Sequence, residues 1–310
     1  MKQASRDHAA RLPVIATALA AGIALASGCG EFSDFTELRD VSYDDRHGER
    51  TTMDVFLPDQ AAPDSDRPAV LLIHGGGWRS FSKDGMRGDA TQLARAGYVS
   101  ASINYRLVPD AVFPENIKDV MCALAFFRGQ AGELGFNPDR IAVMGYSAGG
   151  HLASMLGVAT GAPELQPDCA AGPASPPNAV ISGAGPQDMR LMPQVDAVTE
   201  FVGGTLDEVP DNYDQASPIF HVARNTIEGE PPFLFVHGTG DIFVKLEQSQ
   251  LMRDRLEETG NSATLLAIDD GGHLFNASAD GGHAEGAVST NTPEAWLAIF
   301  DFLADTVGAP

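Results

Sequence analysis

The pentapeptide Gly145-Tyr-Ser-Ala-Gly149 constrains the fold of this chain most, because of the two segments that flank it. The preceding run, 140–144, predicts a short buried strand, and the following run, 150–156, predicts the beginning of a helix. A serine at a sharp strand-to-helix turn takes an awkward backbone conformation, and glycines two residues to either side let the strand and helix approach closely. Ser147 is therefore a candidate nucleophile.

A glycine cluster, His74-Gly-Gly-Gly-Trp78, follows the apolar run 68–73. Its backbone N–H groups can turn toward a ligand because no Cβ atoms interfere. Ester hydrolysis needs such donors, since negative charge grows on the carbonyl oxygen in the transition state, and losing one donor costs roughly 100- to 1000-fold in rate. An ordinary glycine-rich turn is the alternative. The serine turn downstream, in the expected order, favours the donor role.

A serine hydroxyl needs a base, and the base needs an orienting carboxylate. In folds with this type of serine turn, the chain order is serine, then Asp or Glu, then His. Asp241 follows the predicted strand 232–237, and His273 follows the predicted strand 263–268 in a glycine-flanked loop. Both lie past C-terminal strand ends, where active-site loops gather in α/β sheets. We expect them to converge on Ser147.

Other histidines could supply the base. His237 ends a predicted strand and is expected to pack beside the loop of Asp241, whereas His283 lies in a stretch rich in Gly, Ala and Ser. His151 and His221 are expected to be structural.

Other carboxylates could supply the acid. Asp188 also follows a predicted strand, 179–182. Asp269 and Asp270 are nearer to His273 along the chain, but they are expected to form the solvated edge of that turn. Asp241 is favoured by its position and by the chain order.

With these residues in view, the chain resembles α/β-hydrolases of the hormone-sensitive-lipase-like group. More narrowly, it resembles bacterial esterases of the bifunctional deacetylase/feruloyl-esterase-like type. The resemblance extends from about residue 40 to 306. The matching features are HGGGW at 74–78, NYRL at 104–107, Phe113-Pro114 with Asp119 downstream, NPDRI at 137–141, GYSAGGHLA at 145–153, HGTGD at 237–241 with Val244, and GGH at 271–273.

The resemblance implies a role for each matching site residue. It makes Ser147 the nucleophile, Asp241 the orienting acid and His273 the base. It makes the amides of Gly76, Gly77 and Ala148 the donors to the oxyanion. The segment after His273 runs Leu-Phe-Asn and then a long stretch of small residues, so the sequence does not predict that wall of the pocket.

The first 28 residues have the features of an export signal. Basic residues precede an apolar stretch from Val14 to Ala26, which is shorter than the roughly 20 residues of a membrane-spanning helix. The sequence Ala26-Ser-Gly-Cys29 resembles a bacterial lipoprotein box, although Leu25 stands one position earlier than is usual. We expect residues 1–28 to be a lipoprotein-type signal peptide, with Cys29 carrying the lipid and 29–34 forming a tether. Simple secretion is the alternative.

Cys122 and Cys169 remain after removal of the signal. An exported chain with two cysteines can pair them. Cys122 lies on a predicted helix and Cys169 in a proline-rich stretch, so the sequence leaves open a disulfide or two separate buried thiols.

The formal net charge of −22 argues against nucleic acid and against acidic polymers as partners. The expected partner is a small-molecule ester, with membrane association through the N-terminal lipid. Histidine and cysteine spacings match no zinc pattern, and serine acyl chemistry requires no cofactor, so neither metal nor cofactor is expected.

Alternating strand and helix patterns predict the fold class. Segments 35–41 and 51–57 alternate like half-exposed strands and are expected to form an antiparallel edge pair. A helix is expected over 83–96, and another from Pro114 to Gly132. Buried strands that alternate with helices imply a mainly parallel central sheet covered on both faces. Residues 35–310 are thus expected to form one α/β-hydrolase domain.

Two segments interrupt the alternation, near 161–177 and 188–227, and both are expected to lie over the active site. The second carries apolar residues typical of a small helical cap. These residues could line an acyl or aromatic pocket, or they could only seal the cap onto the core.

Three functions remain. The leading hypothesis is a serine carboxylesterase acting on small acyl esters, such as acetylated or feruloylated saccharides, by acyl transfer to Ser147 and hydrolysis by a His273-activated water. The same groups could cleave amides, as formamidases or peptidases do. A non-catalytic ligand-binding surface lipoprotein is the third reading, but such a protein does not need all of these groups.

Overall fold

The structure is a computed structural model and describes residues 35–59, 66–222, 229–273 and 292–310. The predicted signal peptide 1–28, the tether 29–34 with Cys29, and the alternative base His283 lie outside these residues. Among the helices of the described ranges, none combines the length and the apolar character needed to cross a bilayer.

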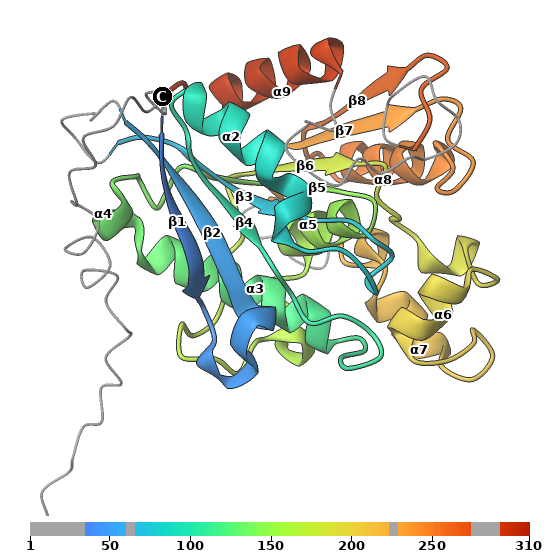
Figure 1. Cartoon of the computed structure of the whole chain (residues 1–310). Coiled ribbons are helices and arrows are strands. Elements are labelled where there is room, and N and C mark those ends of the chain that lie inside the picture. The colour runs from blue at the N-terminus through green and yellow to red at the C-terminus, as the bar shows by residue number, and fades with distance from the viewer. Residues whose placement is uncertain (1–34, 60–65, 223–228, 274–291) are drawn as a thin grey trace, which may run out of the picture.

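Strands β1 to β8 form one sheet in the order β1-β2-β4-β3-β5-β6-β7-β8 (Figure 1). β1 and β2 pair antiparallel at one edge, as their alternating patterns predicted, and β2 pairs antiparallel with β4. The remaining pairs are parallel, which confirms the mainly parallel sheet. The bounds are β1 Phe35–Ser42, β2 Thr52–Pro58, β3 Ala69–Ile73, β4 Val99–Ile103, β5 Ile141–Tyr146, β6 Ala179–Gly183, β7 Phe233–Gly238 and β8 Ala263–Ile268.

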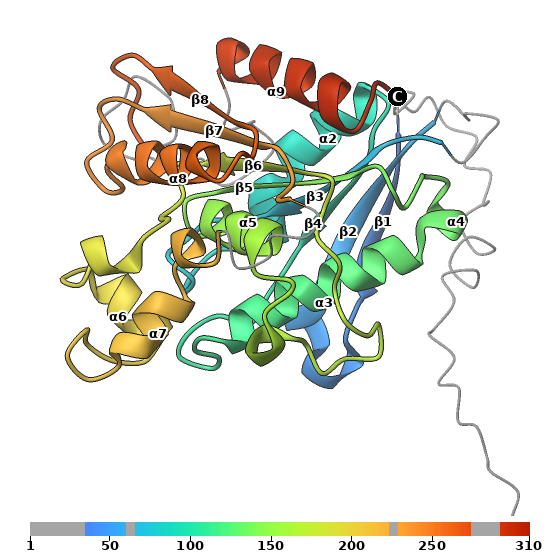
Figure 2. The ribbon, with the colours of Figure 1, turned by 180° about the vertical axis from the view of Figure 1, so that it is seen from behind.

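Helices cover both faces of this sheet (Figures 1 and 2). Helices α2 (Arg87–Arg95) and α9 (Pro293–Thr306) pack on one face, and α3 (Glu115–Gly129), α5 (Ala148–Val158) and α8 (Glu247–Glu258) pack on the other. Each face has its own apolar core, so strands β3 to β7 are buried along their whole length. Burial on both faces explains why β3 and β5 read as nearly continuous apolar runs.

The predicted helices differ in detail from the observed ones. The helix expected over 83–96 is the 3-10 turn η2 (Lys83–Met86) followed by α2. The helix expected to end at Gly132 ends at Gly129, and a single turn, α4 (Ala131–Leu134), follows. The chain leaves α4 at Gly135, whose φ of 74° is the left-handed conformation that favours glycine.

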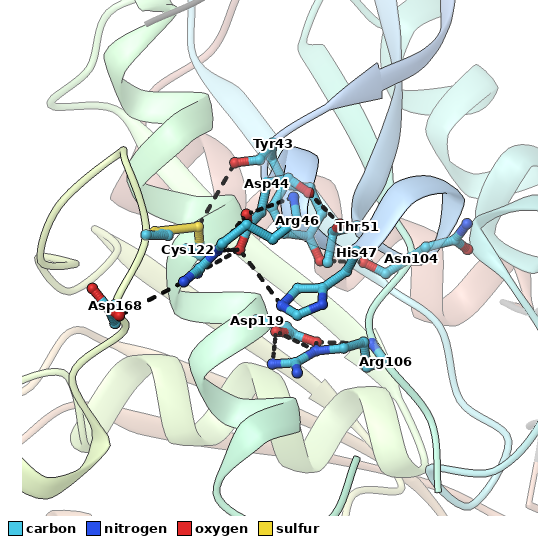
Figure 3. The surroundings of a disulfide bond; sticks show 11 residues. Tyr43, Asp44, Arg46, His47, Thr51, Asn104, Arg106, Asp119, Cys122 and Asp168 are labelled. Carbon is cyan, nitrogen blue, oxygen red and sulfur yellow. Dashed lines mark hydrogen bonds and ion pairs between the residues drawn. A yellow bond between two sulfur atoms is a disulfide. The ribbon is translucent and has the colours of Figure 1, made fainter. Parts of the chain in front are cut away.

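Helix α3 is fixed to the loop after β4 by an ion pair between Arg106 and Asp119 (Figure 3). Arg106 Nη2 lies 2.7 Å from Asp119 Oδ1, and the backbone N–H of Arg106 donates to Oδ2 at 2.9 Å. Asn116 adds a hydrogen bond to the Arg106 carbonyl. Asp119, part of the family resemblance, therefore positions a loop and lies outside the chemistry of the serine.

None of the residues 161–177 lines the cleft at Ser147, which corrects the prediction that this segment covers the active site. It contains the 3-10 turn η3 (Pro163–Leu165) and follows helix α5, which connects the parallel strands β5 and β6 and so carries the chain from Ser147 back toward the N-terminal strand ends. A disulfide joins its Cys169 to Cys122 of α3, and Arg128 donates to the Ser175 and Pro176 carbonyls. The structure thus pairs the two cysteines whose pairing the sequence left open.

The disulfide lies beside a second contact that holds the segment in place (Figure 3). Arg46, in the 3-10 turn η1 (Asp45–Thr51), lies 3.7 Å from Asp168. Both side chains are well exposed, so this ion pair contributes little to stability. The disulfide is the stronger constraint on this part of the chain.

The described part of the second segment, 188–222, forms four short helical turns between β6 and β7: η4 (Met189–Leu191), α6 (Asp196–Val202), α7 (Pro210–Gln215) and η5 (Pro218–Phe220). Met189 and Phe201 are fully buried in the core shared with α3 and α5. Met192 and Val198 also belong to this core, and together with Val195 they line a cleft at Ser147. The segment therefore both seals itself to the core and lines the cleft.

Candidate active site

Ser147 stands at the turn between β5 and α5 with φ 55° and ψ −123°. This is the strained conformation that the strand-to-helix pattern predicted, and few residues other than glycine adopt it. The Ser147 N–H donates to the Gly183 carbonyl at 2.8 Å, and its carbonyl accepts from the His151 N–H at 3.0 Å. Both hydrogen bonds stabilise the turn, so Ser147 can keep its strained backbone conformation.

The glycines of the pentapeptide are required by close backbone contacts. A Cβ on Gly145 would lie 2.3 Å from the Gly149 carbonyl oxygen, and a Cβ on Gly149 would lie 2.1 Å from the Ile73 carbonyl oxygen. Neither position has room for a side chain. The close approach brings Ser147 next to the loop that follows β3.

The structure brings Ser147, His273 and Asp241 together from three loops. His273 Nε2 lies 2.9 Å from Ser147 Oγ, and His273 Nδ1 lies 2.7 Å from Asp241 Oδ2. A carboxylate only accepts, so Nδ1 carries the proton and Nε2 is free to accept from the serine hydroxyl. This is the tautomer that a general base requires.

The carboxylate of Asp241 is fully buried and bonded at both oxygens. Oδ1 accepts from the backbone N–H groups of Phe243 at 2.9 Å and Val244 at 3.0 Å. Burial by itself raises the pKa of Asp241, but hydrogen bonds from His237 and His273 outweigh it, and the pKa falls well below its usual value. Asp241 is therefore ionised at neutral pH.

His237, an alternative base in the sequence, does not contact Ser147 through any hydrogen bond of the structure. Its Nε2–H donates to the Val244 carbonyl at 2.9 Å and faces Asp241 Oδ2 at 3.3 Å, while Nδ1 accepts from the Ser249 hydroxyl at 2.7 Å. The prediction that it packs beside the acid loop is confirmed.

The remaining alternatives also lie elsewhere. Asp188 caps the η4 turn by accepting from the Arg190 N–H at 2.9 Å. Asp269 and Asp270 are exposed at the turn after β8, as predicted. His151 and His221 are buried and hydrogen-bond backbone carbonyl groups, as expected of structural histidines.

The glycine cluster after β3 lies directly beside the serine turn. A Cβ on Gly75 would lie 2.8 Å from the Tyr146 carbonyl oxygen, and Gly76 and Gly77 have φ values of 106° and 58°. Ala148 is the first residue of α5, where backbone N–H groups have no partner within the helix. Gly76, Gly77 and Ala148 line the same cleft as Ser147 and His273.

Trp78 connects this cluster to α5 and to the cap segment 188–222, a contact that no sequence pattern predicted. Its indole Nε1–H donates to His151 Nδ1 at 3.2 Å, and His151 Nε2–H donates to the Ala216 carbonyl at 2.7 Å. The indole also stacks on Phe201, with ring centroids 4.4 Å apart. Burial lowers the pKa of His151 to about 4, so the ring is neutral and can accept.

The cleft at Ser147 has a volume of about 510 Å³. One wall is formed by cap residues, among them Met192, Val195 and Val198, and another by Ile242 and Phe243 next to His273. Both walls are apolar, so the cleft suits a ligand with apolar parts on two sides of a reacting carbonyl. Within the described residues, no group of three or more His, Cys, Asp or Glu side chains is arranged to hold a metal ion.

Comparisons with known proteins agree with this architecture. The family model BD-FAE matches residues 53–256. The esterase LipC of Mycobacterium tuberculosis is 33% identical over 69% of this chain and 54% of its own length. The probable carboxylic ester hydrolase LipM of the same organism is 28% identical over 76% of this chain and 55% of its own length. The chain thus spans about half the length of the curated relatives that it matches.

Among solved structures, a truncated carbohydrate esterase from gut microbiota is similar with a TM-score of 0.74 and 24% identity. The match covers 89% of this chain and 98% of that one, and at this identity it speaks for the fold alone. The β5–Ser147–α5 turn and the BD-FAE match lead to one conclusion: this chain is an α/β-hydrolase that belongs to the BD-FAE family.

Proposed function

We propose that this protein is a serine carboxylesterase that hydrolyses small acyl esters through Ser147, His273 and Asp241. The observation that carries the proposal is the continuous chain of contacts from Ser147 Oγ to His273 Nε2 at 2.9 Å and from His273 Nδ1 to Asp241 Oδ2 at 2.7 Å. The relatives named esterase and probable carboxylic ester hydrolase support the same reaction class.

In the first step, Ser147 Oγ attacks the ester carbonyl carbon while its proton passes to His273 Nε2. The oxyanion that forms is stabilised by the backbone N–H groups of Gly76, Gly77 and Ala148. Collapse of this intermediate breaks the bond between the carbonyl carbon and the alcohol oxygen. His273 returns the proton to the leaving alcohol, and the acyl group stays on Ser147.

In the second step, a water molecule gives a proton to His273 Nε2 and attacks the acyl carbon of Ser147. The bond to Oγ breaks, the proton returns to the serine, and the carboxylic acid leaves. Asp241 stays ionised throughout, because N–H groups surround both of its oxygens. Oδ1 accepts from the amides of Phe243 and Val244, and Oδ2 accepts from His273 and faces the N–H of His237. It stabilises the imidazolium that forms in each step.

The expected substrates are acetylated or feruloylated saccharides. The resemblance to bifunctional deacetylase/feruloyl-esterase-like enzymes, together with the BD-FAE match over residues 53–256, supports an ester of this kind. The cleft of about 510 Å³ has room for a short or aromatic acyl group together with one ring of an alcohol.

The test compares Ser147→Ala with the unaltered protein in p-nitrophenyl acetate hydrolysis. We expect kcat/KM to fall at least about 1000-fold, because the nucleophile is lost. Ser175→Ala is the matched control: this hydroxyl is exposed in the segment 161–177, away from the cleft. Comparable turnover by Ser147→Ala and the unaltered protein would remove Ser147 from the mechanism.

Two further measurements sharpen this test. A phosphonate ester inhibitor should add to Ser147, seen as a mass increase on the peptide that contains it and absent from Ser147→Ala. Hydrolysis of p-nitroacetanilide, set beside p-nitrophenyl acetate, separates ester from amide cleavage. A preference for the anilide would replace the esterase with an amide hydrolase that uses the same groups.

For its location, we propose an exported lipoprotein anchored through Cys29. The support is the apolar stretch Val14 to Ala26 followed by Ser-Gly-Cys29. Two or three acyl chains, at about 0.8 kcal/mol per buried CH₂, would hold the protein at a membrane surface. Radioactive palmitate should label the unaltered chain and not Cys29→Ala. Release of an unlabelled protein into the medium by both would favour simple secretion.

A further inference from the structure

We propose that Ile242 and Phe243 form the binding surface for the alcohol part of the ester, and that this surface selects alcohols that carry a ring. The inference rests on the proposed esterase function and deepens it. It assigns a specificity role to two residues beside the general base.

Both side chains are unusually exposed for apolar residues. Ile242 is 63% exposed and Phe243 is 58% exposed, and they are neighbours in the loop that follows β7. Both line the cleft that contains Ser147. Single exposed apolar residues are scattered over ordinary protein surfaces and need no explanation. Two adjacent ones at the rim of a cleft are instead typical of a ligand contact.

Their loop is held rigidly although their side chains are exposed. The backbone N–H of Phe243 donates to Asp241 Oδ1 at 2.9 Å, and the next residue, Val244, is buried and bonded to both Asp241 and His237. The loop conformation is thus fixed by the same carboxylate that orients His273. A ligand surface built on such a loop is preorganised, so little entropy is lost when a substrate binds.

The chemistry of acyl transfer decides which part of the substrate meets this surface. Besides Ser147 Oγ, the reacting carbon of the tetrahedral intermediate carries three groups: the oxyanion, the acyl chain and the alcohol oxygen. The oxyanion must face the amides of Gly76, Gly77 and Ala148, and the alcohol oxygen must face His273 Nε2, which gives it a proton. The alcohol therefore leaves on the side of His273.

Phe243 lies on that side. Its ring centroid is 5.6 Å from the centroid of the His273 ring. The cap wall lies near the oxyanion donors instead, since a Cβ on Gly77 would lie 3.3 Å from the Ala197 Cβ. The cap residues Met192, Val195 and Val198 are accordingly assigned to the acyl group, and Ile242 and Phe243 to the alcohol.

The shape of the surface selects the class of alcohol. An exposed phenyl ring beside a branched aliphatic side chain offers a flat apolar area and no charge. A ring with an apolar face, such as a cyclohexane or the C–H face of a pyranose, can cover it, whereas a methyl or ethyl group covers only a small part. Ring-bearing alcohols should therefore be preferred over small linear ones.

The experiment measures kcat/KM for cyclohexylmethyl acetate and ethyl acetate. The two esters share the acyl group and release primary alcohols of similar acidity, so they differ mainly in the ring. In Phe243→Ala, we expect the ratio of the two kcat/KM values to fall about tenfold, the effect of losing a few apolar contacts in a pocket. Ile242→Ser should lower the ratio in the same direction. A methyl glycoside monoacetate in place of the cyclohexylmethyl ester tests the sugar ring.

Leu297→Ser is the matched control, because Leu297 is 65% exposed and lies on α9, away from the cleft residues. Its ratio should equal that of the unaltered protein. A second substrate pair, ethyl hexanoate and ethyl acetate, varies the acyl group instead. If Phe243→Ala changes this acyl ratio and leaves the alcohol ratio unaltered, the assignment of the two walls is reversed and the proposal is wrong.

The result is separable from the proposed function. Full activity of Ser147→Ala would overturn the esterase mechanism, whatever the selectivity of Phe243→Ala. An inactive Ser147→Ala together with unaltered ratios in Phe243→Ala and Ile242→Ser would overturn the alcohol surface and leave the mechanism standing. Thermal unfolding of each variant should match the unaltered protein within a few degrees, since the altered side chains are exposed.

Discussion

His237 Nε2 lies 3.3 Å from Asp241 Oδ2, the same oxygen that accepts from His273 Nδ1 at 2.7 Å. The two imidazoles thus converge on one carboxylate oxygen, one from a buried strand end and one from the cleft. His237 contributes to the lowered pKa of Asp241 and also bonds the Val244 carbonyl at 2.9 Å. We interpret His237 as a positioning residue for the Asp241 loop.

Replacing His237 with Leu should test this role. The change leaves the Val244 carbonyl and the Ser249 hydroxyl without their buried partner, which costs about 1–3 kcal/mol in the free energy of unfolding. It also loosens Asp241, so we expect kcat to fall about tenfold with little change in KM. Urea unfolding and p-nitrophenyl acetate kinetics measure the two effects.

Two variants separate positioning from packing around His237. His237→Gln keeps an N–H donor and should recover part of kcat. Ser249→Ala removes only the hydroxyl at the opposite ring nitrogen, so it should lower stability without a matching loss of kcat. An unaltered kcat in His237→Leu would contradict the positioning role.

Trp78→Phe should lower kcat/KM about tenfold. The variant keeps a ring stacked on Phe201 but loses the N–H that donates to His151 at 3.2 Å. Since Gly76 and Gly77 immediately precede this anchor, their amides are held less firmly against the oxyanion. His151→Gln retains an acceptor for the indole and should stay closer to the unaltered protein. Equal losses in both variants would point to packing alone.

Stability should decrease as the pH falls from about 6.5 to about 4. Burial lowers the pKa of His74 and of His151 from 6.5 to about 4, so in this range the unfolded chain binds protons that the folded chain does not. Stabilisation by the neutral rings is complete above 6.5 and is lost as the pH falls. Between pH 7 and pH 5, the free energy of unfolding of His151→Gln should decrease by about 2 kcal/mol less than that of the unaltered protein. Urea unfolding at both pH values checks this prediction. Equal decreases in the free energy of unfolding of the variant and the unaltered protein would contradict it.

Removing the disulfide should destabilise the fold but spare the chemistry. Cys122 and Cys169 are 47 residues apart, and a loop of this length corresponds to about 4 kcal/mol in the chain-entropy treatment. The double variant Cys122→Ala/Cys169→Ala should lose most of this free energy of unfolding, as should the unaltered protein under reducing conditions. Its kcat/KM should stay within about twofold, because neither cysteine lines the cleft at Ser147. A reduced protein as stable as the oxidised one would contradict the prediction.

Local patterns predicted the elements and their order well. The apolar runs before Ser147 and after Pro232 are buried parallel strands, and the alternating segments at the N-terminal edge are antiparallel, because strand burial imposes its own periodicity. The strand-serine-helix pattern predicted the turn at Ser147. The chain order predicted that Asp241 and His273 would approach it.

Predictions from local patterns were wrong where packing between distant segments decides the position or the end of an element. The segment 161–177 follows helix α5, which carries the chain away from the C-terminal strand ends. Its Cys169 is bonded to Cys122 of α3, so the segment packs beside α3, and the cleft is lined by residues of 188–222 instead. The helix after Pro114 ends at Gly129, although Gly132 was the expected end. The position of the segment and the end of the helix both depend on packing against neighbouring elements.

The sequence by itself determined the strand-helix alternation, the serine turn with its glycines, and the acid and base candidates, because these depend on residues close together in the chain. Only the tertiary structure decided that His237 faces the same Asp241 oxygen as His273, that Cys122 pairs with Cys169, and that Trp78 donates to His151, 73 residues further along the chain. Those contacts arise from the register of the sheet and the packing of helices on it, which no local pattern encodes.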